Sequence, residues 1–216
     1  MSLPPELLVF LSSYLIGSIS GGVIIGKIKK TDIRNMGSKS AGATSALRTM
    51  GVRFALIGVL IDVYKGYFAV QYVPSFFMVT NVENITYIKL LAAFASILGH
   101  VYPIFFKFKG GKGVGTALGT LFAIFPMSYA LIALGIWLLM LILSGYVGFS
   151  SIMAGASIPI IHNFLIKYDI ENFYLQLFGI LIGLFFAFTH RENIKRMIAK
   201  EENQFKKIML FKFLKK

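Results

Sequence analysis

Long runs of apolar residues fill most of the chain and limit what it can fold into. A helix needs about 20 apolar residues to cross the hydrocarbon core of a membrane, and five segments have that length: 3–26, 54–79, 87–106, 146–166 and 173–189. Of the 216 residues, 56% are hydrophobic and only 14% are charged, whereas roughly a quarter are charged in a soluble domain. A soluble domain of this size cannot bury so much apolar surface. The sequence therefore predicts an all-α membrane protein and excludes intrinsic disorder.

A sixth apolar run, residues 114–143, has an unusual length. As one helix it would be about 45 Å long, which is too long for an ordinary span. Pro126 lies near its middle, and proline interrupts helices because it lacks an N–H and clashes with the preceding turn. We expect two shorter helices that turn near residues 125–127.

The basic residues favour the same division. The chain has 22 Lys and Arg against 9 Asp and Glu, for a net charge of +13, and basic residues collect on the cytoplasmic side of membrane proteins. With seven spans and an N-terminus outside, 19 of the 22 lie on that side, in residues 27–53, 107–112 and 191–216. A single crossing by 114–143 would leave the nine basic residues of the tail outside. We therefore predict seven transmembrane helices and a cytoplasmic C-terminus.

Several other features narrow the classes of function. Cysteine is absent, and His100, His162 and His190 are too far apart in sequence to suggest a metal site. No D-x-x-D motif and no nucleic-acid-binding pattern is present. The first apolar run lacks the features of a signal peptide, so we interpret it as a mature membrane helix. Without a linker or repeat, residues 1–216 are expected to form one membrane domain with a basic amphipathic tail over 203–216.

Three polar segments on the cytoplasmic side have the composition of phosphate sites. The first, residues 37–48, begins with closely spaced glycines, which allow backbone N–H groups to converge on an anion. Arg48 can hold a phosphate with two hydrogen bonds. The segment also supplies three hydroxyl donors: Ser38, Ser40 and Thr44. The alternative is a flexible basic loop that only sets the topology.

The second segment, residues 108–116, is rich in glycine, carries Lys112 and opens a predicted helix. The N–H groups at a helix N-terminus attract phosphate. Lys112 is followed by Gly113, so the segment is not a Walker A loop. The alternative is a juxtamembrane hairpin whose lysines meet anionic lipid headgroups.

The third segment follows the last span, where His190 and Asn193 lie three residues apart and share a helix face. It could equally be the solvated start of the tail. Inside a predicted span, Asp62 and Lys65 form a possible i,i+3 ion pair, and ionisable residues at such depth are costly and usually functional. Lys65 could instead extend its amine to the membrane interface.

These observations leave two classes of function open. A membrane protein that gathers phosphate-binding groups at its cytoplasmic face could be an enzyme of phospholipid or polyprenyl-phosphate chemistry. It could also be a transporter of a phosphorylated solute or a lipid-binding scaffold, although we find no matched broken helices of the kind that inverted-repeat transporters contain.

The order and spacing of residues 37–48, 62–66, 99–116 and 190–196 resemble those of a known family over nearly the whole chain. The family is the bacterial membrane glycerol-3-phosphate acyltransferase that uses acyl phosphate as donor (PlsY-type). The resemblance implies seven transmembrane helices in the bacterial cytoplasmic membrane, with the active site at the cytoplasmic face. It also implies acyl transfer to the 1-hydroxyl of sn-glycerol 3-phosphate without cofactor or metal, and a functional link to an enzyme that makes acyl phosphate.

Roles carry over to the matching positions of this sequence as follows. The resemblance implies catalytic roles for Ser38, Arg48, Lys112, His190 and Asn193. Acyl phosphate would contact Gly37, Ser38, Ser40, Gly42, Gly110, Gly111 and Gly113. Glycerol 3-phosphate would contact Thr44, Arg48, Lys112, Ser151, His190 and Asn193. Supporting roles would fall to Asp62, Lys65, His100, Thr116 and Glu192.

The chain departs from the family pattern at five positions. Lys39, Ser40 and Ser45 replace a glycine and two asparagines of the first motif, Gly145 stands where arginine is usual, and Gly148 stands where serine is usual. Serine keeps a hydroxyl donor but lacks the reach of the amide, and Lys39 adds a cation to the same segment. A paralogue with low activity or with another acceptor is therefore an alternative.

Overall fold

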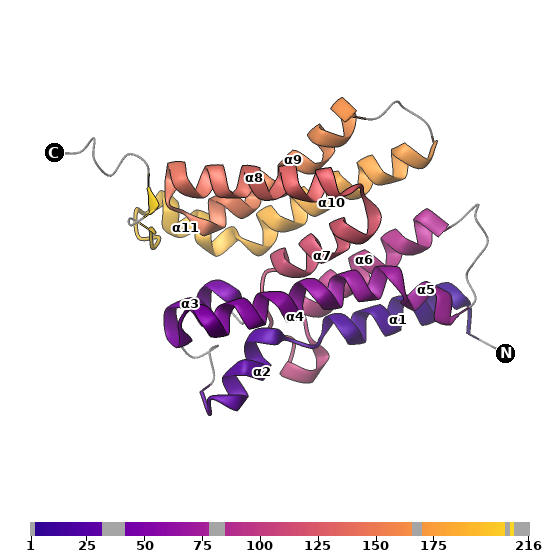
Figure 1. Ribbon diagram of the computed structural model, residues 1–216, viewed down its shortest axis with the longest axis horizontal. Helices are drawn as coiled ribbons and strands as arrows, with labels where there is room; N and C mark the ends of the chain where they lie inside the picture. The colour runs from indigo at the N-terminus through magenta and orange to yellow at the C-terminus, as the bar shows by residue number, and fades with distance from the viewer. Residues whose placement is uncertain (1–2, 32–41, 78–84, 166–169, 206–207, 210–216) are drawn as a thin grey trace. The chain divides into compact units, whose positions relative to one another are not determined.

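The computed structural model describes residues 3–31, 42–77, 85–165, 170–205 and 208–209, and it divides the chain into two compact units. The N-terminal unit is Met1–Phe125 and the C-terminal unit is Pro126–Lys216. Every regular element in the described part of the chain is a helix (Figure 1). The expected all-α architecture is confirmed.

The N-terminal unit is built around two helix pairs. Helix α4 (Val52–Gln71) packs on α7 (Val114–Ile124), and α1 (Pro5–Gly17) packs on α6 (Ile85–Val101). The shorter elements of the unit are α2 (Gly21–Ile28), α3 (Ala43–Met50), α5 (Val73–Phe76) and the 3₁₀ helix η3 (Ile104–Phe106).

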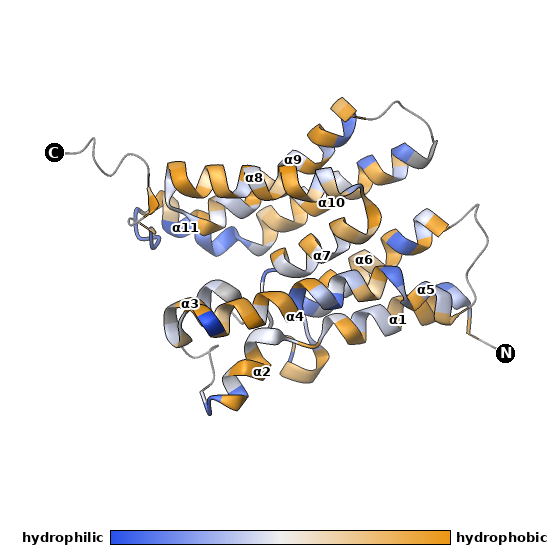
Figure 2. Ribbon diagram, viewed as in Figure 1, coloured by the Kyte–Doolittle hydropathy of each residue, from blue (hydrophilic) through white to orange (hydrophobic). Residues whose placement is uncertain are grey.

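The C-terminal unit contains three long helices and one short one. Helix α9 (Val147–Leu165) packs on both α8 (Met127–Ser144) and α10 (Ile170–Thr189). Helix α11 (Arg191–Ile198) follows directly after α10. Figure 2 shows the contrast between α8, which is apolar along its length, and the hydrophilic α11.

Six helical segments in the described residues are long and apolar enough to cross a membrane: Pro5–Ile28, Val52–Gln71, Ile85–Phe106, Met127–Ser144, Val147–Leu165 and Asn172–Thr189. Val114–Ile124 is a shorter apolar helix. The expected division near Pro126 is confirmed, because α7 ends at Ile124 and α8 begins at Met127.

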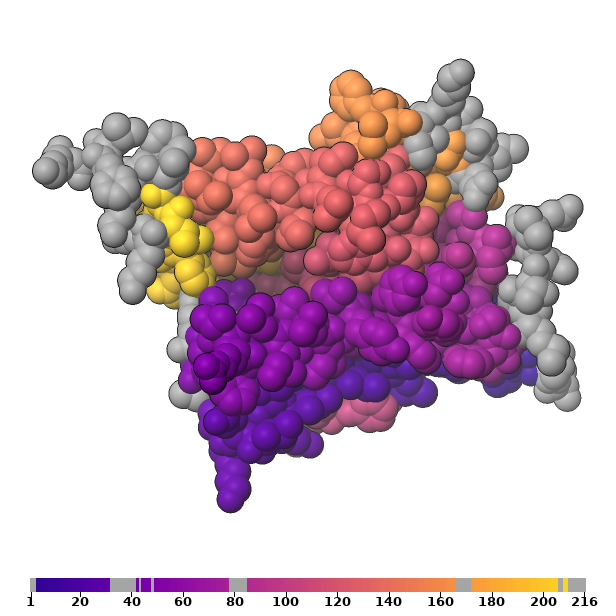
Figure 3. All heavy atoms as spheres, in the orientation of Figure 1, coloured from indigo at the N-terminus to yellow at the C-terminus, as the bar shows by residue number. Residues whose placement is uncertain are grey.

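Close helix packing depends on small residues in the N-terminal unit. A Cβ atom at Gly17 would overlap the Ser96 carbonyl on α6, and one at Gly119 would overlap the Val63 carbonyl on α4. Small residues let helix backbones approach one another in a membrane, where burial of apolar surface adds little to helix association. Helix α4 also exposes large apolar side chains, such as those of Leu60 and Tyr64. Figure 3 shows α4 on the face of the molecule turned to the viewer.

The first predicted span, residues 3–26, corresponds to the candidate span Pro5–Ile28. Its helix is interrupted, however, because α1 ends at Gly17 and α2 begins at Gly21. Such a break exposes backbone polar groups, which must find partners within the protein at membrane depth. The partners come from α4, as described below.

Candidate active site

Three ionisable side chains meet inside the N-terminal unit, and we call them the ion cluster: Asp62, Lys65 and His100. The Lys65 Nζ lies 2.9 Å from Asp62 Oδ1 and 2.9 Å from His100 Nδ1. His100 Nδ1 lies 3.4 Å from the same carboxylate oxygen. All three residues are at least 96% buried. Lys65 therefore pairs inside the protein and does not extend to the interface.

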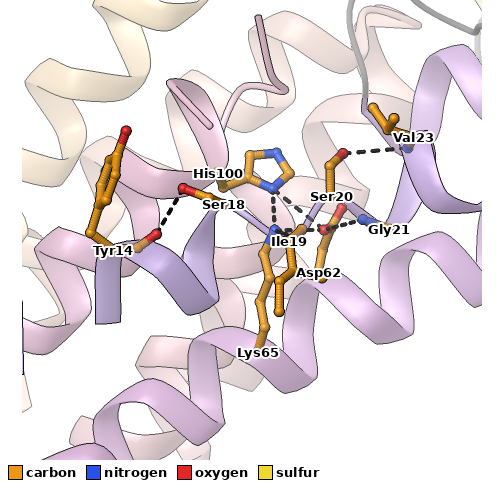
Figure 4. A network of polar contacts seen from close by, with 9 residues as sticks. All are labelled: Tyr14, Ser18, Ile19, Ser20, Gly21, Val23, Asp62, Lys65 and His100. Carbon is orange, nitrogen blue, oxygen red and sulfur yellow. Dashed lines mark hydrogen bonds and ion pairs between the residues drawn. The ribbon is translucent and has the colours of Figure 1, made fainter. Parts of the chain in front are cut away.

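The ion cluster supplies the partners for the break between α1 and α2 (Figure 4). Lys65 Nζ donates to the Ile19 carbonyl at 2.6 Å, and the Gly21 N–H donates to Asp62 Oδ1 at 3.2 Å. Ser20 Oγ accepts from the Val23 N–H at 3.4 Å and so caps α2. The charged residues of α4 thus stabilise irregular backbone that the sequence alone did not predict.

The glycine loop (residues 110–113) lies against His100. The Gly110 N–H donates to the Val101 carbonyl at 3.2 Å, and the Gly111 N–H donates to the His100 carbonyl at 3.1 Å. A Cβ atom at Gly111 would overlap His100 Nε2, and Gly113 has a φ of +87° that disfavours any other residue. The close contact of Gly111 and the positive φ of Gly113 thus explain why glycine stands at these positions, in addition to the anion site that the sequence suggested.

Lys112 comes just before the start of α7, and Thr116 comes just after it. Lys112 directly follows the contact between Gly111 and His100 and is half-buried. Thr116 is fully buried in the first turn of α7, and its Oγ1 has no hydrogen-bond partner among the residues that the structure describes. Its carbonyl lies where a Cβ atom of Gly66 would be, so α7 approaches α4 closely at this point.

Only part of the first polar segment can be placed. Gly37, Ser38, Lys39 and Ser40 lie outside the described residues. Gly42 is the N-cap of α3, and its carbonyl accepts from the Ser45 N–H at 3.0 Å. Thr44 and Arg48 are four residues apart on α3, which places them on the same side of the helix. Of the Arg48 side chain itself the structure describes nothing.

His190 and Asn193 are brought together at the start of α11. His190 is its N-cap and is buried, and its Nδ1 lies 2.9 Å from the Phe186 carbonyl. A carbonyl only accepts, so Nδ1 carries a proton and is the donor in this contact. Asn193 Nδ2 donates to Glu202 Oε1 at 3.1 Å.

The sequence analysis did not identify Glu202 as a residue that supports the site. Its second oxygen, Oε2, accepts from Arg196 Nε at 2.6 Å, so one carboxylate holds both Asn193 and Arg196. Only 7% of its side chain is exposed. The only indication in the sequence was an acidic residue nine positions after Asn193. Because the surrounding tail contains many charged residues, this spacing did not distinguish Glu202 from them.

The remaining predicted residues of this unit have distinct settings. Ser151 is buried on α9, where its Oγ donates to the Val147 carbonyl at 2.9 Å and accepts from Trp137 Nε1 at 3.1 Å. Glu192 forms an ion pair of 3.1 Å with Lys195, and both side chains are exposed. Exposed pairs of this kind contribute little to stability.

The structure accounts for two of the five departures from the family pattern, Gly148 and Gly145. A Cβ atom at Gly148 would lie 2.9 Å from Asn193 Cβ, so Asn193 fills space that a side chain at 148 would need. Gly145 has a φ of +73°, and its carbonyl accepts from the Phe205 N–H at 2.9 Å. The start of the tail therefore packs against the end of α8. We find no structural account of Ser45.

Most of the chain matches the sequence model of a known protein family. Residues 7–200 match the sequence model of the family described as "Glycerol-3-phosphate acyltransferase". This chain belongs to that family. It is similar to the glycerol-3-phosphate acyltransferase of Chlorobium luteolum, with 38% identity over 89% of this chain and 93% of the relative. The Aquifex aeolicus relative of the same name is 36% identical over 92% of this chain and 98% of its own length.

Solved structures of the family agree with this assignment. The chain is similar to the glycerol 3-phosphate form of PlsY (YgiH), an integral membrane glycerol 3-phosphate acyltransferase. The TM-score is 0.81 and the identity 34%, over 99% of this chain and 100% of that one. The lysophosphatidic acid form gives a TM-score of 0.79 at 34% identity, over 94% and 96%. The chain is thus an integral membrane protein of phospholipid synthesis, and its resemblance to PlsY is confirmed.

Proposed function

We propose that this protein transfers a fatty acyl group from acyl phosphate to the 1-hydroxyl of sn-glycerol 3-phosphate. The products are lysophosphatidate and inorganic phosphate. The observation that supports the reaction most directly is the pair of solved PlsY structures, one a glycerol 3-phosphate form and the other a lysophosphatidic acid form. These two ligands differ by one acyl ester, which is the bond that the proposed reaction makes. The acyl-phosphate donor is inferred from the motifs that resemble the PlsY-type family.

The protein is proposed to work in the bacterial cytoplasmic membrane as a single catalytic domain. We assign the seven proposed spans to the six long apolar segments and to the shorter apolar helix α7. In this topology the N-terminus is outside, and the segments that carry Arg48, Lys112 and His190 face the cytoplasm. An enzyme that produces acyl phosphate must supply the donor from the cytoplasm or the inner leaflet.

The proposed binding roles follow charge and hydrogen-bonding capacity. Arg48 and Lys112 hold the phosphate of glycerol 3-phosphate, with Thr44, Ser151, His190 and Asn193 around the rest of that substrate. The phosphate of the donor is held by Ser38 and by the glycines and serine of the two loops, Gly37, Ser40, Gly42, Gly110, Gly111 and Gly113. Two anions that repel one another in water are thereby held together by fixed donors and cations.

Direct transfer is the proposed mechanism, because acyl phosphate is already activated. The 1-hydroxyl oxygen attacks the acyl carbonyl carbon, and a new C–O ester bond forms. The bond from that carbon to the phosphate oxygen breaks, and its electron pair leaves with the phosphate. The hydroxyl proton passes to His190 Nε2 or to a substrate phosphate. Trapping of an acyl group on a serine or threonine of the protein would contradict direct transfer.

The reaction can be tested in membranes that contain the protein. Radiolabelled glycerol 3-phosphate is supplied with palmitoyl phosphate or with palmitoyl-CoA, and lysophosphatidate is measured. We expect product with palmitoyl phosphate alone. Product with palmitoyl-CoA alone would contradict the proposed donor. Glycerol-phosphate flux into proteoliposomes without a donor would favour the transporter alternative. If no product forms but the Ser40→Asn variant is active, the chain is a paralogue with reduced activity.

A further inference from the structure

The ammonium group of Lys65 has a complete set of partners. A lysine ammonium carries three N–H donors and no acceptor. Its three neighbours are the Ile19 carbonyl at 2.6 Å, Asp62 Oδ1 at 2.9 Å and His100 Nδ1 at 2.9 Å. Each donor therefore has one acceptor, and His100 Nδ1 is among them. An accepting Nδ1 carries no proton, so the proton of the neutral imidazole is on Nε2.

The alternative protonation states of His100 conflict with its neighbours. A proton on Nδ1 would point at the Lys65 ammonium 2.9 Å away. Asp62 Oδ1 offers it no better partner, because it lies 3.4 Å away and already accepts from Lys65 and from the Gly21 N–H. Lys65 and Asp62 thus select the Nε2–H tautomer and fix the plane of the ring.

The other edge of the ring faces the glycine loop. Figure 4 shows the second ring nitrogen of His100 pointing away from Lys65 and Asp62. A Cβ atom at Gly111 would overlap this Nε2, so the Cα of Gly111 lies directly against the ring. The Gly111 N–H also donates to the His100 carbonyl. The loop is held by the backbone and by the ring of one histidine, immediately before Lys112.

We propose that His100 is a positioning residue for the acyltransferase reaction. Its ring, oriented by Lys65 and Asp62, supports Gly111 and thereby sets where Lys112 meets the phosphate of glycerol 3-phosphate. This inference rests on the proposed function, in which Lys112 binds that substrate. Loss of the support shifts Lys112, which weakens binding of the substrate phosphate and raises KM for glycerol 3-phosphate more than it lowers kcat.

A pair of complementary substitutions tests the contact. Gly111→Ala places a methyl group where His100 Nε2 lies, and His100→Asn keeps an acceptor for Lys65 but removes the ring atoms at Gly111. We expect each single variant to raise KM for glycerol 3-phosphate by about tenfold, since small displacements of binding groups have effects of this size. In the double variant the methyl group fills the vacated space, and KM should return most of the way to the wild-type value.

Melting temperatures of the purified variants separate positioning from folding. Gly135→Ala is the matched control, because a Cβ atom there meets no described atom within 4 Å. Additive effects of the two substitutions on both KM and Tm would refute the contact. Recovery of Tm in the double variant without any change of KM in the singles would show a purely structural role and overturn the proposal.

The tautomer of His100 can be tested in the wild-type protein by nitrogen NMR with ¹⁵N-labelled histidine. This test needs no substitution in the ion cluster. We expect His100 to show an unprotonated Nδ1 and a protonated Nε2. A protonated Nδ1 would overturn the proposal. Wild-type turnover with palmitoyl phosphate tests the proposed function by itself, so an inactive wild type with the expected tautomer and coupled Tm values would contradict that function and not the contact between His100 and Gly111.

Discussion

At the scale of single residues, the structure places Lys112 in a different setting from two lysines that are close to it in sequence. Lys107, Lys109 and Lys112 belong to one short basic segment, and the first two are exposed. Lys112 instead follows the glycine that packs on His100 and precedes α7. A half-buried lysine beside a constrained backbone loses less freedom on binding an anion than a lysine in solvent does.

Lys112→Ala is therefore expected to abolish turnover, because the substrate phosphate loses a fixed cation. Lys109→Ala, three residues earlier, should retain nearly full activity. Lysophosphatidate formation from palmitoyl phosphate measures both variants. Equal rates in the two variants would contradict the assignment of Lys112 to the substrate.

Arg48→Ala is expected to behave as Lys112→Ala does, since it removes a bidentate phosphate contact.

The buried charge of Lys65 predicts a large effect on stability. Lys65→Met leaves Asp62 buried without its cation and the Ile19 carbonyl without its donor. Removal of one partner of a buried ion pair costs about 3–5 kcal/mol. We expect a pronounced fall in the melting temperature of the detergent-purified protein, with Lys109→Met as the exposed control.

The pair of charges offers a further check on this prediction. An Asp62→Asn/Lys65→Met variant leaves no unpaired charge from the pair and should melt higher than Lys65→Met alone. A Lys65→Met variant as stable as the control would mean that Lys65 lies at the membrane interface and contributes no buried ion pair.

At the scale of elements, the start of the tail and α9 hold Asn193, a residue of α11, from two sides. Glu202 accepts from its amide, and the backbone of α9 at Gly148 lies against its Cβ. Glu202 also binds Arg196, so the residues after α11 fold back on the helix. The orientation of a proposed substrate ligand thus depends on the segment that follows it.

Glu202→Ala should impair both stability and activity, because it removes two charge-assisted hydrogen bonds that are each worth about 1.5–3 kcal/mol. Glu201→Ala is the matched control, since the neighbouring Glu201 is exposed. Thermal unfolding and KM for glycerol 3-phosphate are the measurements. If the two alanine variants behave alike, the carboxylate of Glu202 does not hold Asn193.

Gly148→Ser introduces a side chain into space that Asn193 occupies. The added Cβ atom would lie 2.9 Å from Asn193 Cβ, so the asparagine must move. We expect KM for glycerol 3-phosphate to rise by several-fold to tenfold, in line with a sub-ångström shift of a binding group. Gly135→Ser adds the same side chain at a position where a Cβ atom meets no atom of the described residues within 4 Å, and it should have no effect. An unchanged KM in Gly148→Ser would indicate that Asn193 does not contact this substrate.

Elements were predictable where the signal is local. The length of the apolar runs and the position of Pro126 predicted α7 and α8, because both features act on the adjacent backbone. The break after Gly17 was not predictable in this way, since the donor for the Ile19 carbonyl is Lys65, 46 residues later. His100 joins Lys65 across 35 residues, and Glu202 reaches Asn193 from a segment without periodicity. Partners of this kind depend on tertiary packing.

At the scale of the whole molecule, the proposed topology gives the charge of +13 two purposes. Basic residues orient a membrane protein during insertion. A positive face also raises the local concentration of anionic substrates and their rate of arrival. Both substrates of the proposed reaction are phosphorylated, so in the proposed topology the basic face is also the face where the reaction needs cations.

The proposed topology can be tested throughout the chain, because the protein contains no cysteine. Single cysteines are introduced at Asn84, in the segment between the second and third spans, and at Lys216. With an N-terminus outside and seven spans, we expect a membrane-impermeant thiol reagent to label Asn84→Cys in intact cells. Lys216→Cys should react only after the membrane is opened, because the nine basic residues of the tail favour the cytoplasm. Labelling of Lys216→Cys in intact cells would give α7 and α8 a single crossing and would place His190 and Asn193 on the opposite side of the membrane from Lys112. Acyl transfer by these residues acting together would then be impossible, so this experiment tests the site and the topology at once.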